Sequence, residues 1–206
     1  MDDRSVKLPA ASGSAADESV PPRARNAQAT RQAILCAARR RFGQDSYDQV
    51  GCRDIGAEAG VDGSLVNRYF GSKEDLFAAV LDAVGKDPVD ILSGEASDFG
   101  RRAAEALLFG EADAQGGLEF VNLAMRSAAS PVAQKVVRRH LQEHFLGPFG
   151  AWVCGEDAEI RACLAASVLI GVAVMRGVLC RERMGGDNAQ IAAERLARLL
   201  QALADA

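Results

Sequence analysis

Residues 53–77 read RDIGAEAGVDGSLVNRYFGSKEDLF. The spacing of apolar residues predicts one short helix over 53–59 and a second over 64–70, and Asp62 is placed to cap the start of the second. Two short helices joined by a three- or four-residue turn with a nearby glycine are typical of a helix-turn-helix. Ser72, followed three residues later by Asp75, predicts the start of a further helix that ends near Gly85.

The segment before this motif predicts an arginine-rich helix. Thr30 is a candidate cap, Ile34, Ala38 and Phe42 recur at helical spacing, and Gly43 ends the pattern. The net charge of −4 does not exclude a nucleic-acid partner, because a local basic patch attracts phosphates within about 8 Å at physiological salt. The basic residues here are Arg23, Arg25, Arg31, Arg39, Arg40, Arg41 and Arg53, against Asp45 and Asp48.

The chain after Pro88 shows no alternating strand pattern, so the whole protein is predicted to be all-α. We expect Gly147 and Pro148 to end or kink one of its helices. Residues 1–22, rich in Ala, Ser, Asp, Gly and Pro, are predicted to be a disordered tail. The predicted C-terminal helices span 89–108, 118–128, 131–147, 157–183 and 188–204, with a polar connection over 110–117.

Composition and the N-terminus limit the cellular setting. The opening residues Met1-Asp2-Asp3-Arg4 contain no apolar signal core, and the longest apolar stretch, around 162–174, is shorter than the ~20 residues of a membrane span. We therefore expect a cytoplasmic protein with no membrane partner. Five cysteines without a Cys-x-x-Cys pair argue against a disulfide framework or a zinc ribbon.

The runs 54–61 and 65–77 resemble the N-terminal domain of TetR-family transcriptional regulators, and the likeness extends over 29–81. Segments 126–131 and 171–176 resemble, more loosely, the ligand-binding and dimerisation domains of that family. The resemblance implies a three-helix DNA-binding domain over 23–85. It also implies a helical effector-binding and dimerisation domain over 86–206.

The resemblance also implies roles for individual residues. Arg53 is expected to reach a base, while Tyr69 and Lys73 are expected to grip phosphates; Tyr69 is alternatively part of the core and Lys73 merely solvated. Departures from the family pattern include Gly51, which offers no side-chain oxygen as a cap, and Gly56 inside a helix. The expected DNA-binding residues are Cys52, Arg53, Gly63, Ser64, Leu65, Asn67, Arg68, Tyr69 and Lys73.

The two histidines form the pattern His140-x-x-Glu143-His144, which matches an inverted zinc-peptidase signature. A catalytic zinc site needs a third protein ligand, and the sequence offers none nearby. A small helical metal-dependent hydrolase is therefore the alternative function, and a pair that lines a pocket or lies on the surface is the preferred interpretation. We accordingly expect no enzyme activity, no cofactor and no metal site.

Aromatic, methionine and histidine side chains in the C-terminal half suggest an apolar effector pocket between helices, with ordinary core packing as the alternative. We expect a hydrophobic or amphipathic small-molecule effector. The candidate ligand-binding residues are Phe109, Phe120, Met125, His140, His144, Phe149, Trp152 and Met175.

The helix predicted over 157–183 is apolar over much of its circumference, and the last helix carries a leucine stripe. These features predict a four-helix interface between two copies. We therefore expect a homodimeric repressor that binds a double-stranded DNA operator until an effector releases it. The candidate interface residues are Leu164, Val168, Met175, Leu196, Leu199 and Leu203.

Overall fold

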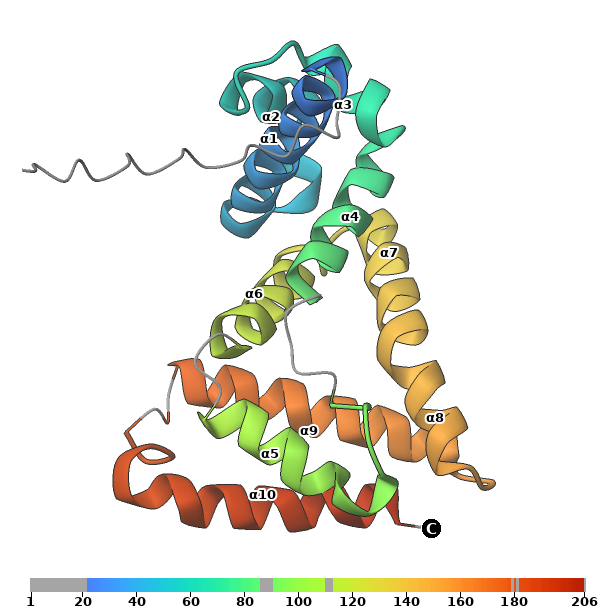
Figure 1. Ribbon diagram of the computed structural model, residues 1–206, viewed down its shortest axis with the longest axis vertical. Helices are drawn as coiled ribbons and strands as arrows, with labels where there is room; N and C mark the ends of the chain where they lie inside the picture. The colour runs from blue at the N-terminus through green and yellow to red at the C-terminus, as the bar shows by residue number, and fades with distance from the viewer. Residues whose placement is uncertain (1–21, 86–90, 110–112, 179, 181, 206) are drawn as a thin grey trace, which may run out of the picture.

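The computed structural model describes residues 22–85, 91–109, 113–178, 180 and 182–205. Within these ranges the chain forms helices and turns, with no strand, as the all-α prediction requires. The tail predicted over 1–22 falls outside the described residues except for Pro22, which begins the first helix. Figure 1 shows α1–α4 at one end, α6 and α7 diverging beneath α4, and α5, α9 and α10 layered at the base.

The N-terminal unit contains four α-helices: α1 (Pro22–Gln44), α2 (Cys52–Glu58), α3 (Gly63–Phe70) and α4 (Lys73–Gly85). A short 3-10 turn, η1 (Tyr47–Gln49), precedes α2. The predicted start of the first helix at Thr30 is wrong, because the Thr30 hydroxyl donates to the Asn26 carbonyl inside α1, 2.8 Å away. Proline is well tolerated in a first helical turn, and the Ala, Arg and Gln residues that follow favour helix.

The C-terminal unit contains α5 (Phe99–Phe109), α6 (Asp113–Arg126), α7 (Pro131–Leu141), α8 (Gly147–Val153), α9 (Ala158–Val178) and α10 (Ala189–Ala204). The helix predicted from residue 89 begins ten residues later. Gly94 takes a φ of 112° and the 3-10 turn η2 (Ala96–Asp98) precedes α5. The predicted connection over 110–117 is also too long, because α6 already begins at Asp113. A last 3-10 turn, η4 (Gly186–Asn188), leads into α10.

Gly147 and Pro148 do not end the helix predicted over 131–147. Instead the π-helical segment η3 (Gln142–Leu146) joins α7 to α8, and Pro148 lies in the first turn of α8. A proline lacks the N–H that an interior helical residue donates, but this costs little in a first turn. The helix therefore continues to Val153 with a change of hydrogen-bond pattern at 142–146.

Two clusters of buried apolar side chains hold the chain together. The first contains Ile34, Phe42, Val66 and Phe77 from the N-terminal unit, and it also contains Leu123 of α6. The second lies between α5, α8, α9 and α10 and includes the rings of Phe99 and Phe149, whose centroids are 5.0 Å apart. The first cluster thus crosses the boundary expected at residues 85 and 86, because its other members include Ala133 and Val136 of α7.

Gly100 sets the spacing between α5 and α10. Its amide donates to the Gln201 side-chain oxygen at 3.0 Å. A Cβ placed at Gly100 would lie 2.1 Å from the Ala197 carbonyl oxygen and 2.7 Å from the Gln201 backbone nitrogen. Both neighbours are backbone atoms, so an alanine requires the two helices to move apart.

We predict that Gly100→Ala lowers the free energy of unfolding by about 1–3 kcal/mol, the usual cost of overpacking a core. The matched control is Gly43→Ala, because no atom lies within 4 Å of a Cβ at that helical position. The control should leave stability unchanged or raise it by up to about 1 kcal/mol. Urea unfolding followed by circular dichroism measures both, and equal effects of the two substitutions would contradict the close packing of α5 on α10.

Candidate DNA-binding site

Local hydrogen bonds fix the α2–turn–α3 unit. The Gly51 amide donates to the Asp54 carboxylate at 3.1 Å, which satisfies the start of α2 without a capping side chain at residue 51. The predicted cap at Asp62 is confirmed, because its carboxylate accepts from the Ser64 amide at 2.8 Å. Gly71 ends α3 at a φ of 88°, a conformation that favours glycine, and its amide donates to the Asn67 carbonyl.

Helix α3 divides into a buried and an exposed face. Val66 is completely buried, and the half-buried Leu65 packs against the same cluster. Ser64, Asn67 and Arg68 are exposed. Of the α3 residues expected to read DNA, these three present hydrogen-bonding groups on the surface, whereas Leu65 is mainly a packing residue.

The start of α2 lies beside the start of α3. Arg53 is exposed, and its Cα would be 3.0 Å from a Cβ placed at Gly63. The Cys52 Sγ lies 3.7 Å from the Asn67 side-chain oxygen. The structure therefore brings Cys52, Arg53, Gly63 and Asn67 together at one end of the helix pair. Gly56 also allows α2 to approach the start of α3 closely, because a Cβ at residue 56 would lie 2.7 Å from the Gly63 Cα.

Tyr69 and Lys73 are both half-buried. The Tyr69 ring packs against the first cluster, which supports the alternative that it belongs partly to the core. The Lys73 ammonium lies 4.2 Å from the centre of the Tyr47 ring, at the first residue of α4. This cation–π contact holds the lysine near the end of α3.

Three arginines of α1, namely Arg39, Arg40 and Arg41, form ion pairs and so do not contribute free charge to the basic patch that the sequence suggested. Arg40 and Arg41 both pair with the Glu58 carboxylate of α2, at 2.6 Å and 2.5 Å. Both arginines hold the pKa of Glu58 below its usual value, the Arg40 hydrogen bond most strongly. Arg39 pairs with Glu119 of α6. In the described part of the chain neither Arg53 nor Arg68 forms an ion pair, so the charge of both guanidinium groups is not neutralised within the protein.

Polar contacts also tie the N-terminal unit to the corner between α6 and α7. The Ser130 hydroxyl donates to the Asp48 carboxylate at 2.9 Å, and the Arg126 guanidinium donates to the Gln44 carbonyl at 2.8 Å. Ser130 also caps α7. The two units are therefore joined by directional bonds as well as by the shared apolar cluster.

The eight candidate effector residues differ in burial and surroundings. Phe149 has no exposed surface and Trp152 packs beside it, so both are core residues of the second cluster. Phe109 and Met125 are 47% and 71% exposed. Met175 also lies on the surface, and the effector pocket stays a prediction.

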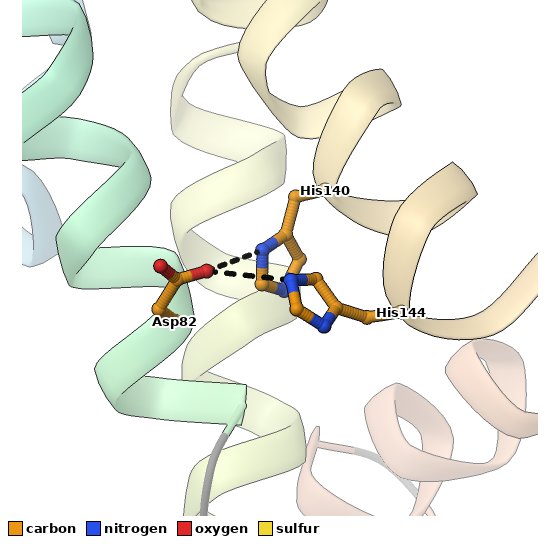
Figure 2. A group of neighbouring side chains, drawn as sticks. All are labelled: Asp82, His140 and His144. Carbon is orange, nitrogen blue, oxygen red and sulfur yellow. Dashed lines mark hydrogen bonds and ion pairs between the residues drawn. The ribbon is translucent and has the colours of Figure 1, made fainter.

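Phe120, His140 and His144 do lie together. The ring centroids of Phe120 and His140 are 5.5 Å apart, and those of the two histidines are 4.4 Å apart. His140 Nδ1 lies 3.1 Å from Asp82 Oδ1 of α4, and His144 Nε2 lies 3.5 Å from the same oxygen (Figure 2). Burial lowers the pKa of His140, with a smaller contribution from His144, while Asp82 acts in the opposite direction. Sequence reasoning missed Asp82, because 58 residues separate it from His140.

The six candidate interface residues fall into two groups, one packed in the core and one exposed. Leu196 is buried in the second cluster, and Val168 and Leu203 are half-buried against it, so Leu196 is a core residue. The other three, Leu164, Met175 and Leu199, are exposed large apolar side chains. Ile160 on α9 and Ile191 on α10 are also exposed, although neither was among the candidates.

Helix α9 is long and apolar enough, by length and composition alone, to cross a membrane. The window 158–176 has a mean hydropathy of 1.9, and 28% of it is buried. The expectation that no segment qualifies is therefore corrected. One face, which includes Ala162 and Ala165, packs in the second cluster, while Ile160 and Leu164 lie on the exposed face.

Comparison with known families agrees with this architecture. Residues 97–203 match the family model described as a tetracyclin repressor-like C-terminal domain, which covers just over half of the chain. Residues 34–80 match the model of bacterial regulatory proteins of the tetR family. The chain belongs to the TetR family. This membership gives the hydrolase alternative no support.

Curated relatives and solved structures agree with the family. The HTH-type transcriptional repressor Rv3405c of Mycobacterium tuberculosis is 37% identical over 101 residues, which cover 45% of this chain and 54% of the relative. An HTH-type transcriptional regulator of Mycobacterium bovis matches to the same extent. The chain thus spans about half the length of the curated relatives that it matches.

Among solved structures, a TetR-family regulator from Streptomyces coelicolor is 29% identical with a TM-score of 0.55, covering 86% of this chain and 95% of that one. NalD of Pseudomonas aeruginosa, the secondary repressor of a multidrug efflux pump, has a TM-score of 0.63 at 19% identity. That match covers 85% of this TetR-family chain and 95% of NalD, and it shows a shared fold alone.

The buried Tyr47 gives a test of the core beneath Lys73. Burial raises the pKa of Tyr47 from 10.0 to about 12, with Glu74 and Asp48 adding to the shift, and its hydroxyl has no partner among the described residues. The neutral phenol is therefore favoured in the folded protein. Its contribution to stability is complete below pH 10.0 and is lost as the pH rises to about 12.

We predict that, between pH 9 and about pH 11.5, the free energy of unfolding falls less in the Tyr47→Phe variant than in the wild type, because phenylalanine cannot ionise. The chain has one other tyrosine, Tyr69, and Tyr69→Phe is the matched control that keeps the wild-type pH dependence. Urea unfolding at both pH values measures the difference. An unchanged pH dependence in Tyr47→Phe would show that the phenol is not responsible.

Proposed function

We propose that this protein is a DNA-binding transcriptional repressor that reads a two-fold operator with α3. The observation that carries the proposal is the arrangement of the helix pair. Val66 anchors α3 in the core, while Ser64, Asn67 and Arg68 face outward next to the exposed Arg53 of α2. A short helix that presents such donors and acceptors suits the major groove, where base edges carry a distinct hydrogen-bond pattern.

Family membership supports the same conclusion, and the name of the Mycobacterium tuberculosis relative favours repression. Within the proposal, Arg53 and Arg68 contact bases or phosphates, and Lys73 and Tyr69 contact the phosphate backbone at the end of α3. Cytoplasmic location follows from binding to DNA. An effector bound by the C-terminal helices would act through α4, which contacts both α6 and α7.

The repressor acts as a homodimer in this proposal, because one recognition helix covers too few base pairs for strong specificity. The surface that fits a second copy is the exposed apolar face of α9 and α10. Leu164 of α9 and Leu199 of α10 are 49% and 53% exposed, and large exposed apolar surfaces mark interaction sites. Burial of this face would account for the apolar composition of α9.

The DNA contacts are tested with an operator selected from random duplexes by the purified protein. We predict that Arg68→Ala weakens binding to that operator by about 1–3 kcal/mol and binding to unrelated DNA by less, because a bidentate contact to a base is lost. Arg53→Ala should weaken binding to the operator and to unrelated DNA in the same way as Arg68→Ala. Fluorescence anisotropy at fixed salt measures both affinities.

The matched control is Arg101→Ala, which removes an exposed arginine from α5 that pairs with Asp98 and Glu105. Its operator affinity should equal that of the wild type. Equal losses on operator and unrelated DNA would reassign Arg53 or Arg68 to phosphate contact. Failure to select any sequence would contradict the proposed function.

The dimer is tested by placing charges on its proposed face. We predict that Leu164→Glu combined with Leu199→Glu gives a monomer and abolishes operator binding, because buried like charges oppose association. Sedimentation velocity gives the oligomeric state. Val132→Glu is the control, since Val132 is an exposed apolar residue of α7 away from this face and its replacement should leave a dimer. A wild-type protein that sediments as a monomer at micromolar concentration would contradict the dimer.

A further inference from the structure

The Asp82, His140 and His144 side chains have no assigned role in the DNA-binding mechanism. They come from three elements: Asp82 from α4, His140 from the last turn of α7, and His144 from the π-helical segment η3 (Figure 2). One ligand atom from each lies within 4.8 Å of the other two. π-Helical segments are rare and occur frequently at functional sites.

The distances between these atoms suit a metal ion. Asp82 Oδ1 lies 3.1 Å from His140 Nδ1 and 3.5 Å from His144 Nε2. Ligands bound tetrahedrally to zinc at about 2.1 Å are about 3.4 Å from one another. An ion could therefore be held by all three groups after small side-chain rotations, without movement of the helices.

The surroundings leave a coordination position open. The three side chains line a hollow of about 310 Å³ together with Arg139 and Glu143. His140 is 10% exposed and His144 is 57% exposed, so an ion can enter from the side of His144. Two carboxylates and one guanidinium face the hollow, so the fixed charge favours a cation when both imidazoles are neutral.

We propose that Asp82, His140 and His144 form a binding site for one divalent transition-metal ion of the zinc type. Two imidazoles and a carboxylate are ligands that Zn²⁺ accepts, whereas Mg²⁺ and Ca²⁺ prefer oxygen ligands alone. The fourth position faces the hollow and takes water or an oxygen or nitrogen atom of a small molecule. The third ligand that the sequence lacked near His140 and His144 is therefore supplied by α4.

Such an ion would join two parts of the fold. Asp82 lies near the end of α4 in the N-terminal unit, whereas His140 of α7 and His144 of η3 belong to the C-terminal unit. The free energy of metal binding would add to the packing between α4 and α7 and stabilise the described conformation. Metal binding itself does not depend on the proposed DNA-binding function.

The test uses the full chain without a polyhistidine tag. Calorimetric titration with Zn²⁺ should show one ion per chain, and Zn²⁺ should raise the melting temperature. Co²⁺ in place of Zn²⁺ should give the visible absorption of a site with nitrogen and oxygen ligands and no sulfur-to-cobalt band in the near ultraviolet. His144→Gln and Asp82→Asn should each weaken binding by at least about tenfold and remove the melting shift.

Exposed thiols are the competing ligands, so the control variant combines Cys36→Ser, Cys154→Ser and Cys163→Ser. This variant should bind Zn²⁺ as the wild type does. Loss of binding in the cysteine variant, or a sulfur-to-cobalt band, would overturn the proposal. Unchanged binding in His144→Gln, with circular dichroism showing a folded protein, would also overturn it, as would a wild-type protein that binds no ion.

Discussion

The packing of α4 against α6 and α7 is the constraint on which the rest of the structure depends. Leu76, Phe77 and Leu81 of α4 have no exposed surface, and the cluster that buries them includes Leu123 of α6 and Val136 of α7. The DNA-reading helices thus complete their core with residues from the C-terminal unit. A change in α6 or α7 must alter the surroundings of α4, and through the same cluster it must alter the support of α3, because close-packed interiors transmit small displacements.

Electrostatic contacts reinforce this apolar connection. Arg39 of α1 pairs with Glu119 of α6, and Ser130 at the start of α7 bonds to Asp48 beside α2. Partly exposed pairs of this kind add little stability, so their role is to fix orientation. The pairing of Arg40 and Arg41 with Glu58 has a related consequence, since it holds α1 against α2 and engages both guanidinium groups within the protein. The proposed metal site would act directly on the contact between α4 and the α7–η3 helix.

Local features of the sequence predicted the N-terminal helices to within about one residue, apart from the start of α1. Asp62 and Gly71 determine α3 through contacts a few residues away, so the sequence contains the necessary information. The misassigned residues depend on distant partners. Phe149 is a core residue because α5 and α9 cover it, and Asp82 meets His140 only because α4 packs on α7. Periodicity in the sequence indicates which face of a helix is apolar, but it does not identify the distant segment that packs against that face.

The shared core is tested most directly by hydrogen exchange of the Leu123→Ala variant, since removal of a buried leucine side chain typically costs about 2–5 kcal/mol. If α6 supports the DNA-reading unit, exchange should accelerate in peptides from α3 (Gly63–Phe70) as well as in those from α7 (Pro131–Leu141). Leu200→Ala, in the second cluster, is the matched control and should act first on α5 and α10. Faster exchange in α7 with unchanged exchange in α3 would contradict the account.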